Sequence, residues 1–308
     1  MITSYLKIAI RSLLKKKIYT IINILGLSVG AAASLLIFLY VHHEMSYDKF
    51  LPDYERIYRV VEDRIYPDHQ SQFAMIPGGF ATILPEEIPE VELSTRLVGF
   101  PNFSQVVKYK DKIFSENYFF FADSNFFEIF PFRLLKGNQK DVLRHPNTII
   151  LTATTATKYF GNEDPLGKFL ELGGGKQEVV GVMEDVPENS HIKFDALGPT
   201  VVVNFLRDPN YYVAGTFTYI RLASGADPKM VDSKMPSLVE KYAAGQIERD
   251  LGVTFKKYQA DGNGYRYFLQ PLQDIHLTSN RSNEIKTNGS LTVVNVLIFI
   301  SVLILVTA

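Results

Sequence analysis

Two groups of residues have the side-chain types that bind metal ions. His42, His43 and Glu44 are adjacent, and His191 precedes Asp195 by four positions. Adjacent residues on a helix do not face one site, and no third ligand is evident for His191 and Asp195. We interpret residues 42–44 as a polar collar at the end of an apolar segment, and we place His145 and His276 in turns. We therefore predict no metal site.

Three further patterns resemble catalytic or phosphate-binding motifs but lack the context that those motifs require. Gly173–Lys176 resembles a phosphate loop, but Gln177 stands where that loop has Ser or Thr. Gly26–Gly30 reads G-x-S-x-G inside an apolar run, without the strand, turn and helix that this nucleophile motif needs. Ser12 and Lys15 have the Ser-Lys spacing but no enclosing pocket. We expect no catalytic residue, no bound cofactor and no enzymatic activity in this chain.

A group of eight aromatic residues is the remaining candidate for function. It consists of Tyr118, Phe119, Phe120, Phe121, Phe126, Phe127, Phe130 and Phe132. Such a group either forms an exposed apolar surface that binds an apolar substrate or partner, or fills a hydrophobic core. We favour the core of a strand-rich subdomain.

The composition excludes several classes of protein. The 308 residues contain 32 Lys and Arg against 33 Asp and Glu, which disfavours a globally basic nucleic-acid binder. The absence of cysteine rules out disulfides and thiolate sites.

Residues 18–41 carry no charge and, as a helix, would extend about 36 Å, enough to cross a membrane. The run continues past Ala31–Ala33, so we predict an uncleaved anchor rather than a signal peptide. The segment before it, residues 1–17, contains five basic residues and no acid, which predicts a cytoplasmic amino terminus. These residues are Lys7, Arg11, Lys15, Lys16 and Lys17.

We expect residues 1–17 to form a basic amphipathic helix on the membrane surface, in contact with lipid headgroups. Within the anchor, Gly26, Gly30 and Ser34 recur every four residues and form a small-residue stripe. Such a stripe lets a second helix approach closely. A second uncharged run, residues 291–308, is barely long enough to cross a membrane. We interpret residues 289–308 as the start of a second membrane helix that is cut by the end of the chain.

The region between the two runs, residues 42–288, has 27 basic and 33 acidic residues and is expected outside the cytoplasm. Its length is near the limit for one core, so we predict two subdomains. Strand patterns occupy 57–61, 148–151, 217–222 and 265–269, and helix patterns occupy 79–88, 152–160 and 227–244. A hairpin is expected across Gly173–Gly175. The fold class is α+β, with a strand-rich part inserted into a mixed part.

The order of eight segments resembles the amino-terminal part of FtsX-like, MacB-like ABC transporter permeases, especially the large permeases common in Bacteroidetes. The segments are Ser46–Phe50, Arg56–Val60, Ala122–Phe130, Leu134–Gly137, Ala156–Gly161, Asp164–Lys168, Val180–His191 and Asp274–Leu277. They are motifs of fold, so no active-site residue is carried over from the family.

The resemblance implies a periplasmic domain between two membrane helices in a bacterial inner membrane. A porter-like α+β part would cover about 44–92 and 200–280, and the inserted β-rich part would cover about 93–199. A separate cytoplasmic ABC ATPase would hold ATP and magnesium, and a second permease copy or homologue would pair with this chain. The function implied is efflux or mechanotransmission, with a periplasmic substrate or adaptor as a further partner. The alternative is a membrane-anchored periplasmic binding or sensor domain without an ATPase.

Overall fold

The computed structural model describes residues 11, 13–99 and 104–307. The chain forms two compact units, which are described separately. One unit contains Met1–Tyr47 and Gly289–Ala308, and the other contains Asp48–Asn288. Lys7 and most of the predicted amphipathic segment lie outside the described residues.

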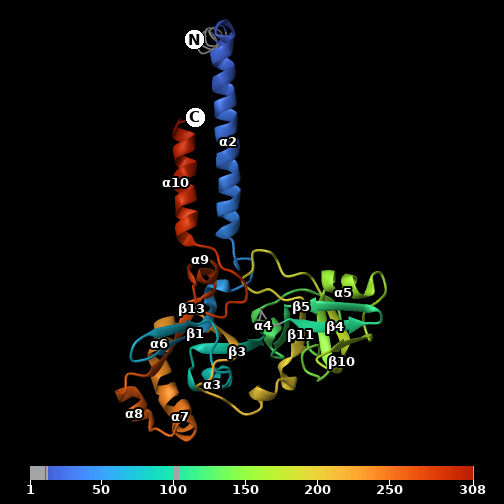
Figure 1. Ribbon diagram of the computed structural model, residues 1–308, viewed down its shortest axis with the longest axis vertical. Coiled ribbons are helices and arrows are strands. Elements are labelled where there is room, and N and C mark those ends of the chain that lie inside the picture. The colour runs from blue at the N-terminus through green and yellow to red at the C-terminus, as the bar shows by residue number, and fades with distance from the viewer. Residues whose placement is uncertain (1–10, 12, 100–103, 308) are drawn as a thin grey trace. The chain divides into compact units, whose positions relative to one another are not determined.

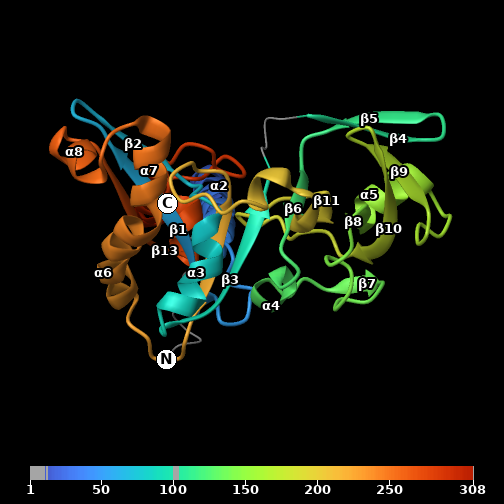
Figure 2. The ribbon, with the colours of Figure 1, turned by 90° about the horizontal axis from the view of Figure 1, so that it is seen from below.

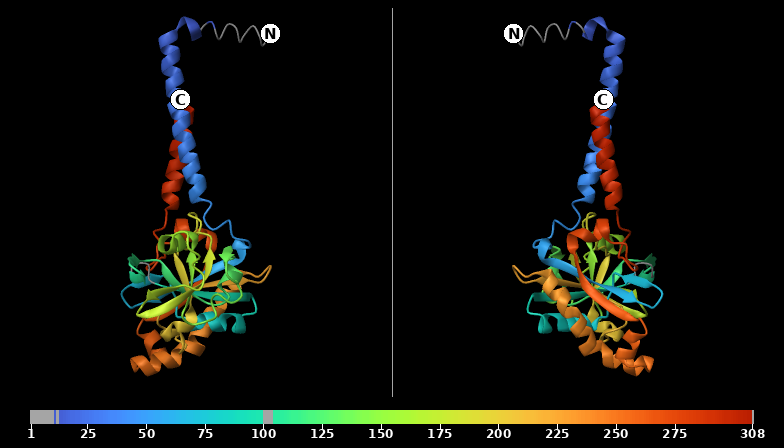
Figure 3. Two further views of the ribbon diagram at one scale, coloured as in Figure 1. Left: turned by 90° about the vertical axis from the view of Figure 1, so that its right-hand side faces the viewer. Right: turned by 90° about the vertical axis from the view of Figure 1, so that its left-hand side faces the viewer.

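The first unit consists of two apolar helices, α2 (Lys17–Glu44) and α10 (Leu291–Thr307), which pack side by side (Figures 1 and 3). Within the described residues, α2 is the one helix long and apolar enough to cross a membrane, and α10 has 17 residues. Gly30 and Ser34 are buried, and the Ser34 hydroxyl donates to the Ser301 carbonyl at 3.3 Å. Gly26 is exposed, with open space where a Cβ would stand. Arg11 and Lys15–Lys17 are also exposed.

The second unit is organised around one continuous sheet (Figure 2). Its strand order is β13-β1-β12-β3-β6-β11-β8-β10-β9-β4-β5, with β2 added to β1 and β7 added to β10. We call β2, β13, β1, β12 and β3 the mixed half, and β11, β8, β10, β9, β4, β5 and β7 the strand-rich half. Strand β6 (Phe119–Ala122) joins the two halves, since it pairs with both β3 and β11.

The mixed half is built from strands that are far apart in the sequence. These are β1 (Ile57–Ile65), β2 (Gln70–Phe73), β3 (Val91–Val98), β12 (Phe217–Leu222) and β13 (Gly264–Pro271). Helices α3 (Gly79–Glu87), α6 (Pro228–Leu238), α7 (Ala244–Leu251) and α8 (Phe255–Ala260) share one apolar core with this part of the sheet. Helix α6 starts where expected, because the Asp227 side chain accepts from the Lys229 amide and Pro228 occupies the first turn.

The strand-rich half contains β4 (Gln105–Tyr109), β5 (Lys112–Glu116), β7 (Leu134–Lys136), β8 (Thr148–Thr152), β9 (Phe169–Leu172), β10 (Gly175–Met183) and β11 (Ala196–Pro199). Helix α5 (Ala153–Phe160) packs on it, capped by the Thr152 side chain and ended by Gly161 at φ 63°. Gly137 follows β7 at φ 100°, and a Cβ there would lie 2.4 Å from the Val180 carbonyl oxygen. Only glycine fits this position without a shift of the backbone.

The aromatic group fills the interior, as the core interpretation predicts. Phe119, Phe120, Phe126, Phe127, Phe130 and Phe132 are buried, and Tyr118 and Phe121 are partly buried. However, these residues were expected in the core of the strand-rich part alone, and most of them also pack against the mixed half. Except for Phe119, the buried members share a core with Ile57, Phe217 and Tyr219 of the mixed half. Helix α4 (Phe126–Ile129) therefore helps to hold the two halves together.

Several predicted boundaries differ from the structure. The expected start of the inserted part, residue 93, falls inside β3, which pairs antiparallel with β12 and so belongs to the mixed half. The helix predicted over 227–244 consists of α6 and a π-helical turn, Val239–Ala243, and it extends beyond the predicted end as α7. His276 does not lie in a turn but on the short helix α9 (Ile275–Thr278), where it is buried. The glycine hairpin is confirmed between β9 and β10.

Candidate functional site

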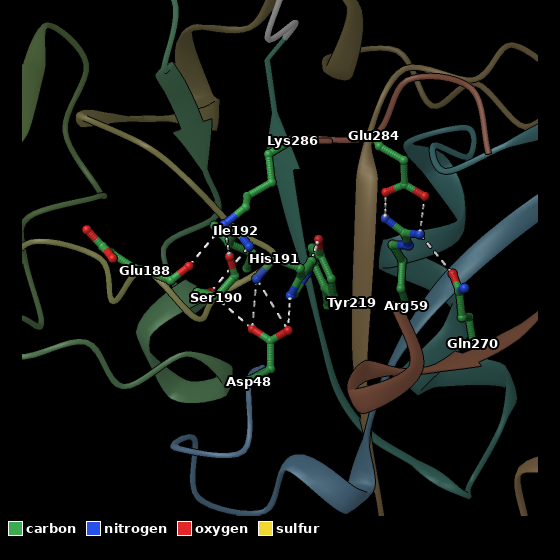
Figure 4. Close-up of polar contacts among 10 residues, drawn as sticks. All are labelled: Asp48, Arg59, Glu188, Ser190, His191, Ile192, Tyr219, Gln270, Glu284 and Lys286. Carbon is green, nitrogen blue, oxygen red and sulfur yellow. Dashed lines mark hydrogen bonds and ion pairs between the residues drawn. The ribbon is translucent and has the colours of Figure 1, made fainter. Parts of the chain in front are cut away.

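A set of buried and partly buried polar side chains holds both ends of the Asp48–Asn288 unit onto strands β1 and β12 of its sheet (Figure 4). In the sequence, Asp48 follows shortly after α2 and Asn288 shortly precedes α10. We call this set the junction network. Its members are Asp48, Arg59, Ser190, His191, Tyr219, Gln270, Ser279, Glu284 and Lys286.

Asp48 forms the first half of the junction network. Its carboxylate accepts from the Ser190 hydroxyl at 3.0 Å and from the His191 amide at 3.1 Å. Its own amide donates to the Asn189 carbonyl at 2.8 Å. Asp48 is fully buried and has a left-handed φ of 59°, a conformation that Asp tolerates better than most residues. Both the backbone and the side chain of Asp48 thus form hydrogen bonds with the 189–191 segment.

His191 extends this contact to strand β12. Its Nε2 lies 2.8 Å from the Tyr219 hydroxyl, and its Nδ1 lies 2.8 Å from Asp48 Oδ2 without the alignment of a hydrogen bond. Burial raises the pKa of Tyr219, so its hydroxyl remains protonated at neutral pH. The result is a buried chain of polar contacts from Asp48 to the middle of β12.

Arg59 forms the second half, on strand β1. Its guanidinium makes two hydrogen bonds with the Glu284 carboxylate, Nη1 to Oε2 at 2.6 Å and Nη2 to Oε1 at 2.8 Å. Nη2 also donates to Gln270 Oε1 at 2.8 Å and to the Ser279 hydroxyl at 3.0 Å. The Arg59 side chain is 0% exposed, and that of Glu284 is 13% exposed. Such two-point pairing is the strongest arrangement that a carboxylate and a guanidinium can form.

The electrostatics of Glu284 follow from this pairing. Burial opposes ionisation of the carboxyl, but the hydrogen bonds and the charge of Arg59 outweigh it, so the pKa of Glu284 lies below its ordinary value. Glu284 is therefore ionised at neutral pH and compensates the charge of Arg59. Removing either partner would leave a buried charge alone.

Two further residues secure the end of the unit. The Lys286 ammonium donates to the carbonyls of Glu188 and Ser190, at 3.0 and 3.1 Å. The side-chain Nδ2 of Asn288 donates to the Ser279 carbonyl at 3.0 Å. Lys286 thereby binds the same segment that holds Asp48.

The two halves of the network meet on one pair of residues in the sheet. Arg59 of β1 stands directly opposite Tyr219 of β12 in the antiparallel register. Arg59 also stands opposite Gln270 of β13. The two ends of the unit, near Asp48 and near Asn288, are therefore attached to neighbouring points on the adjacent strands β1, β12 and β13.

The sequence alone did not indicate this network. Three of the segments that carry the family resemblance meet in it, Asp48 from Ser46–Phe50, Arg59 from Arg56–Val60, and His191 from Val180–His191. One signal was visible, because Arg59 interrupts an apolar strand pattern. Its partners could not be assigned, since Glu284 lies more than 200 positions along the chain.

The residues considered as metal ligands take other roles. His191 contacts Asp48 and Tyr219. The pKa of Asp195 is raised by burial of its carboxyl group and, to a smaller extent, by the negative charge of Glu116. Among the residues that the structure describes, no group of three His, Asp or Glu could hold a metal ion.

Comparisons with known proteins agree with this fold. Of solved structures, a domain assigned to a permease protein from Porphyromonas gingivalis has a TM-score of 0.61 at 24% identity, covering 80% of this chain and 98% of that one. This likeness shows the fold.

Two further structures score lower. The periplasmic region of MacB from Actinobacillus actinomycetemcomitans has a TM-score of 0.45 at 15% identity, covering 71% of this chain and 90% of that one. The extracellular domain of the noncanonic ABC-type transporter YknZ from Gram-positive bacteria has a TM-score of 0.43 at 17% identity, covering 68% of this chain and 99% of that one.

No curated protein matches the sequence. The model of the MacB-like periplasmic core domain matches residues 20–238, which is more than half of the chain and confirms the predicted resemblance. The chain therefore belongs to the family of MacB-like periplasmic core domains.

Proposed function

We propose that this chain is part of an ABC transporter permease in a bacterial inner membrane, and that a separate cytoplasmic ATPase moves its periplasmic domain. Family membership and the long apolar helix α2 support this proposal. The basic residues before α2 support a cytoplasmic amino terminus. In this proposal α10 begins a second membrane crossing, a second permease copy or homologue pairs with the chain, and ATP and magnesium are bound by the ATPase.

The junction network is the observation that carries the mechanical part of the proposal. Movement of the membrane helices reaches the periplasmic unit through its two chain ends. Those ends are bound to one cross-strand pair, Arg59 and Tyr219, through Glu284 on one side and His191 on the other. A buried ion pair that is joined by two hydrogen bonds resists displacement better than a flexible linker does. Helix motion would thus be passed to the sheet instead of being lost in the linkers.

These 308 residues contain no cysteine, so cysteines introduced into them can be labelled once any cysteine elsewhere in the full-length permease is replaced by serine. Lys176→Cys on β10 and Lys256→Cys on α8 place two spin labels on exposed positions of the two halves. The labelled full-length permease is reconstituted with an ABC ATPase that co-purifies with it. Pulsed electron paramagnetic resonance then measures the distance between the labels without nucleotide and with a non-hydrolysable ATP analogue.

We expect the nucleotide to shift the distance distribution, and Glu284→Gln to reduce that shift while ATP hydrolysis continues. Glu240→Gln makes the same charge change at an exposed position and should leave the shift intact. An unchanged distribution in a complex that hydrolyses ATP would refute coupling. A permease for which no ATPase can be found would favour the anchored sensor alternative.

A further inference from the structure

The Asp48–Asn288 unit contains an open cleft of about 760 Å³ away from the junction network. Helix α3 and strand β3 of the mixed half form one wall, through residues such as Thr82 and Ser94. The loop before β8 contributes Arg144 from the strand-rich half, and the segment between β11 and β12 contributes Thr200 and Arg207. The volume lies within the range of about 300–1,000 Å³ that is typical of small-molecule sites.

Two of the residues that line the cleft, Arg96 and Asp123, form an ion pair with each other. The Asp123 carboxylate accepts from Arg96 Nε at 2.8 Å, from Arg96 Nη2 at 3.0 Å and from the Arg96 amide at 2.9 Å. The Thr200 hydroxyl also donates to it. Asp123 is thus engaged by four donors and is poorly available to neutralise a second arginine.

Two arginines in the cleft are not neutralised. Arg144 and Arg207 are exposed, and their side chains form no hydrogen bond or ion pair within the described part of the chain. Asp208, the sequence neighbour of Arg207, forms no ion pair with it. The ionisable residues lining the cleft are Arg96, Arg144, Arg207 and Asp123, so their net charge is positive. This positive site lies in a region, residues 42–288, where acids outnumber bases by 33 to 27.

We propose that this cleft binds a small oxyanion-bearing ligand, a carboxylate or a phosphate, held between Arg144 and Arg207. A guanidinium offers paired donors that match both oxyanions, and the hydroxyls of Thr82 and Ser124 provide neutral polar groups on the same walls. The ligand would contact both halves of the sheet at once. This site does not depend on ATPase coupling, and its test needs no nucleotide.

Full-length protein in a phosphate-free, non-ionic detergent is titrated with three probes. These are acetyl-trialanine with a free carboxylate, acetyl-trialanine amide, and inorganic phosphate. Saturation-transfer NMR reports binding of the peptides, and phosphorus line broadening reports binding of phosphate. The test variant is Arg144→Gln with Arg207→Gln, which removes two charges that have no internal partner and so leaves the fold intact. The control, Lys229→Gln with Lys256→Gln, removes two charges from exposed residues that do not line the cleft.

We expect the free-acid peptide or phosphate to bind, the amide not to bind, and the arginine variant to bind at least about tenfold more weakly. The lysine control should bind as the unaltered protein does. Whichever anion binds more tightly identifies the chemistry, carboxylate or phosphate. Binding of neither anion, equal binding of the amide, or unchanged binding by the arginine variant would overturn the proposal.

Discussion

The replacement Glu284→Gln tests the energetic role of the junction network most directly. The amide has the shape of the carboxylate but no charge, and its NH2 group would face the donors of a fully buried Arg59. Loss of one partner from a buried ion pair costs about 3–5 kcal/mol. For a unit of this size, we expect the midpoint of thermal unfolding to fall by about 6–15 °C.

The assay is pulse proteolysis of the full-length protein in detergent across a urea series, which reports unfolding of the Asp48–Asn288 unit. The matched control is the double variant Arg59→Met with Glu284→Leu. It replaces the pair by apolar side chains of similar size, and such replacements are often nearly neutral. The double variant should therefore be more stable than Glu284→Gln alone.

The pH dependence gives an independent check. Because Arg59 holds the pKa of Glu284 below its ordinary value of 4.5, the contribution of Glu284 is complete above about pH 4.5 and is lost as the pH falls through the lowered pKa. The stability gap between the unaltered protein and Glu284→Gln should narrow in acid. A gap below about 1 kcal/mol at pH 7, or a gap that widens in acid, would refute the reasoning.

Three other predictions concern single sites. Asp48→Asn replaces a fully buried carboxyl group that accepts hydrogen bonds from Ser190 and His191, and should lower the unfolding free energy by about 2 kcal/mol in urea denaturation. An effect below about 0.5 kcal/mol would contradict the assigned role. Burial raises the pKa of Glu62 to about 6, so its contribution to stability is complete below about pH 4.5 and is lost as the pH rises through 6. Glu62→Gln should gain about 2 kcal/mol relative to the unaltered protein between pH 4.5 and 7.5, and a gap that does not change with pH would disprove this. Gly137→Ala should lower the midpoint of thermal unfolding by several degrees, because its Cβ would lie 2.4 Å from a backbone oxygen, whereas a tolerated alanine would show that this turn can relax.

Many of the local elements were predictable because their signals are local. The predicted strand over 217–222 coincides with β12, and the helix patterns at 79–88 and 152–160 match α3 and α5 within a residue or so. The Thr152 cap and Gly161 set the ends of α5, and both signals act over a few residues. The helix over 227–244 was predicted too short, because the π-helical turn lets the chain continue into α7.

The relation between the two halves was not predictable in the same way. Sequence order suggested an insertion with its own core, whereas β6 joins both halves into one sheet and most of the buried aromatic residues pack against strands of each. Burial alone does not say which neighbours a phenylalanine meets. That depends on strand pairings between residues 100 or more positions apart, such as Phe217 with Leu97.

The sequence by itself determined the apolar helix near the amino terminus, the α+β class and the family, because hydropathy, periodicity and ordered motifs are properties of the chain read in one dimension. Only the tertiary structure placed Asp48 against His191, Arg59 against Glu284, and Arg144 and Arg207 in the lining of one cleft. The physical reason is that a buried charge needs a partner, but its type does not say which of many opposite charges will be that partner. The folded sheet makes that choice by bringing distant strands into register.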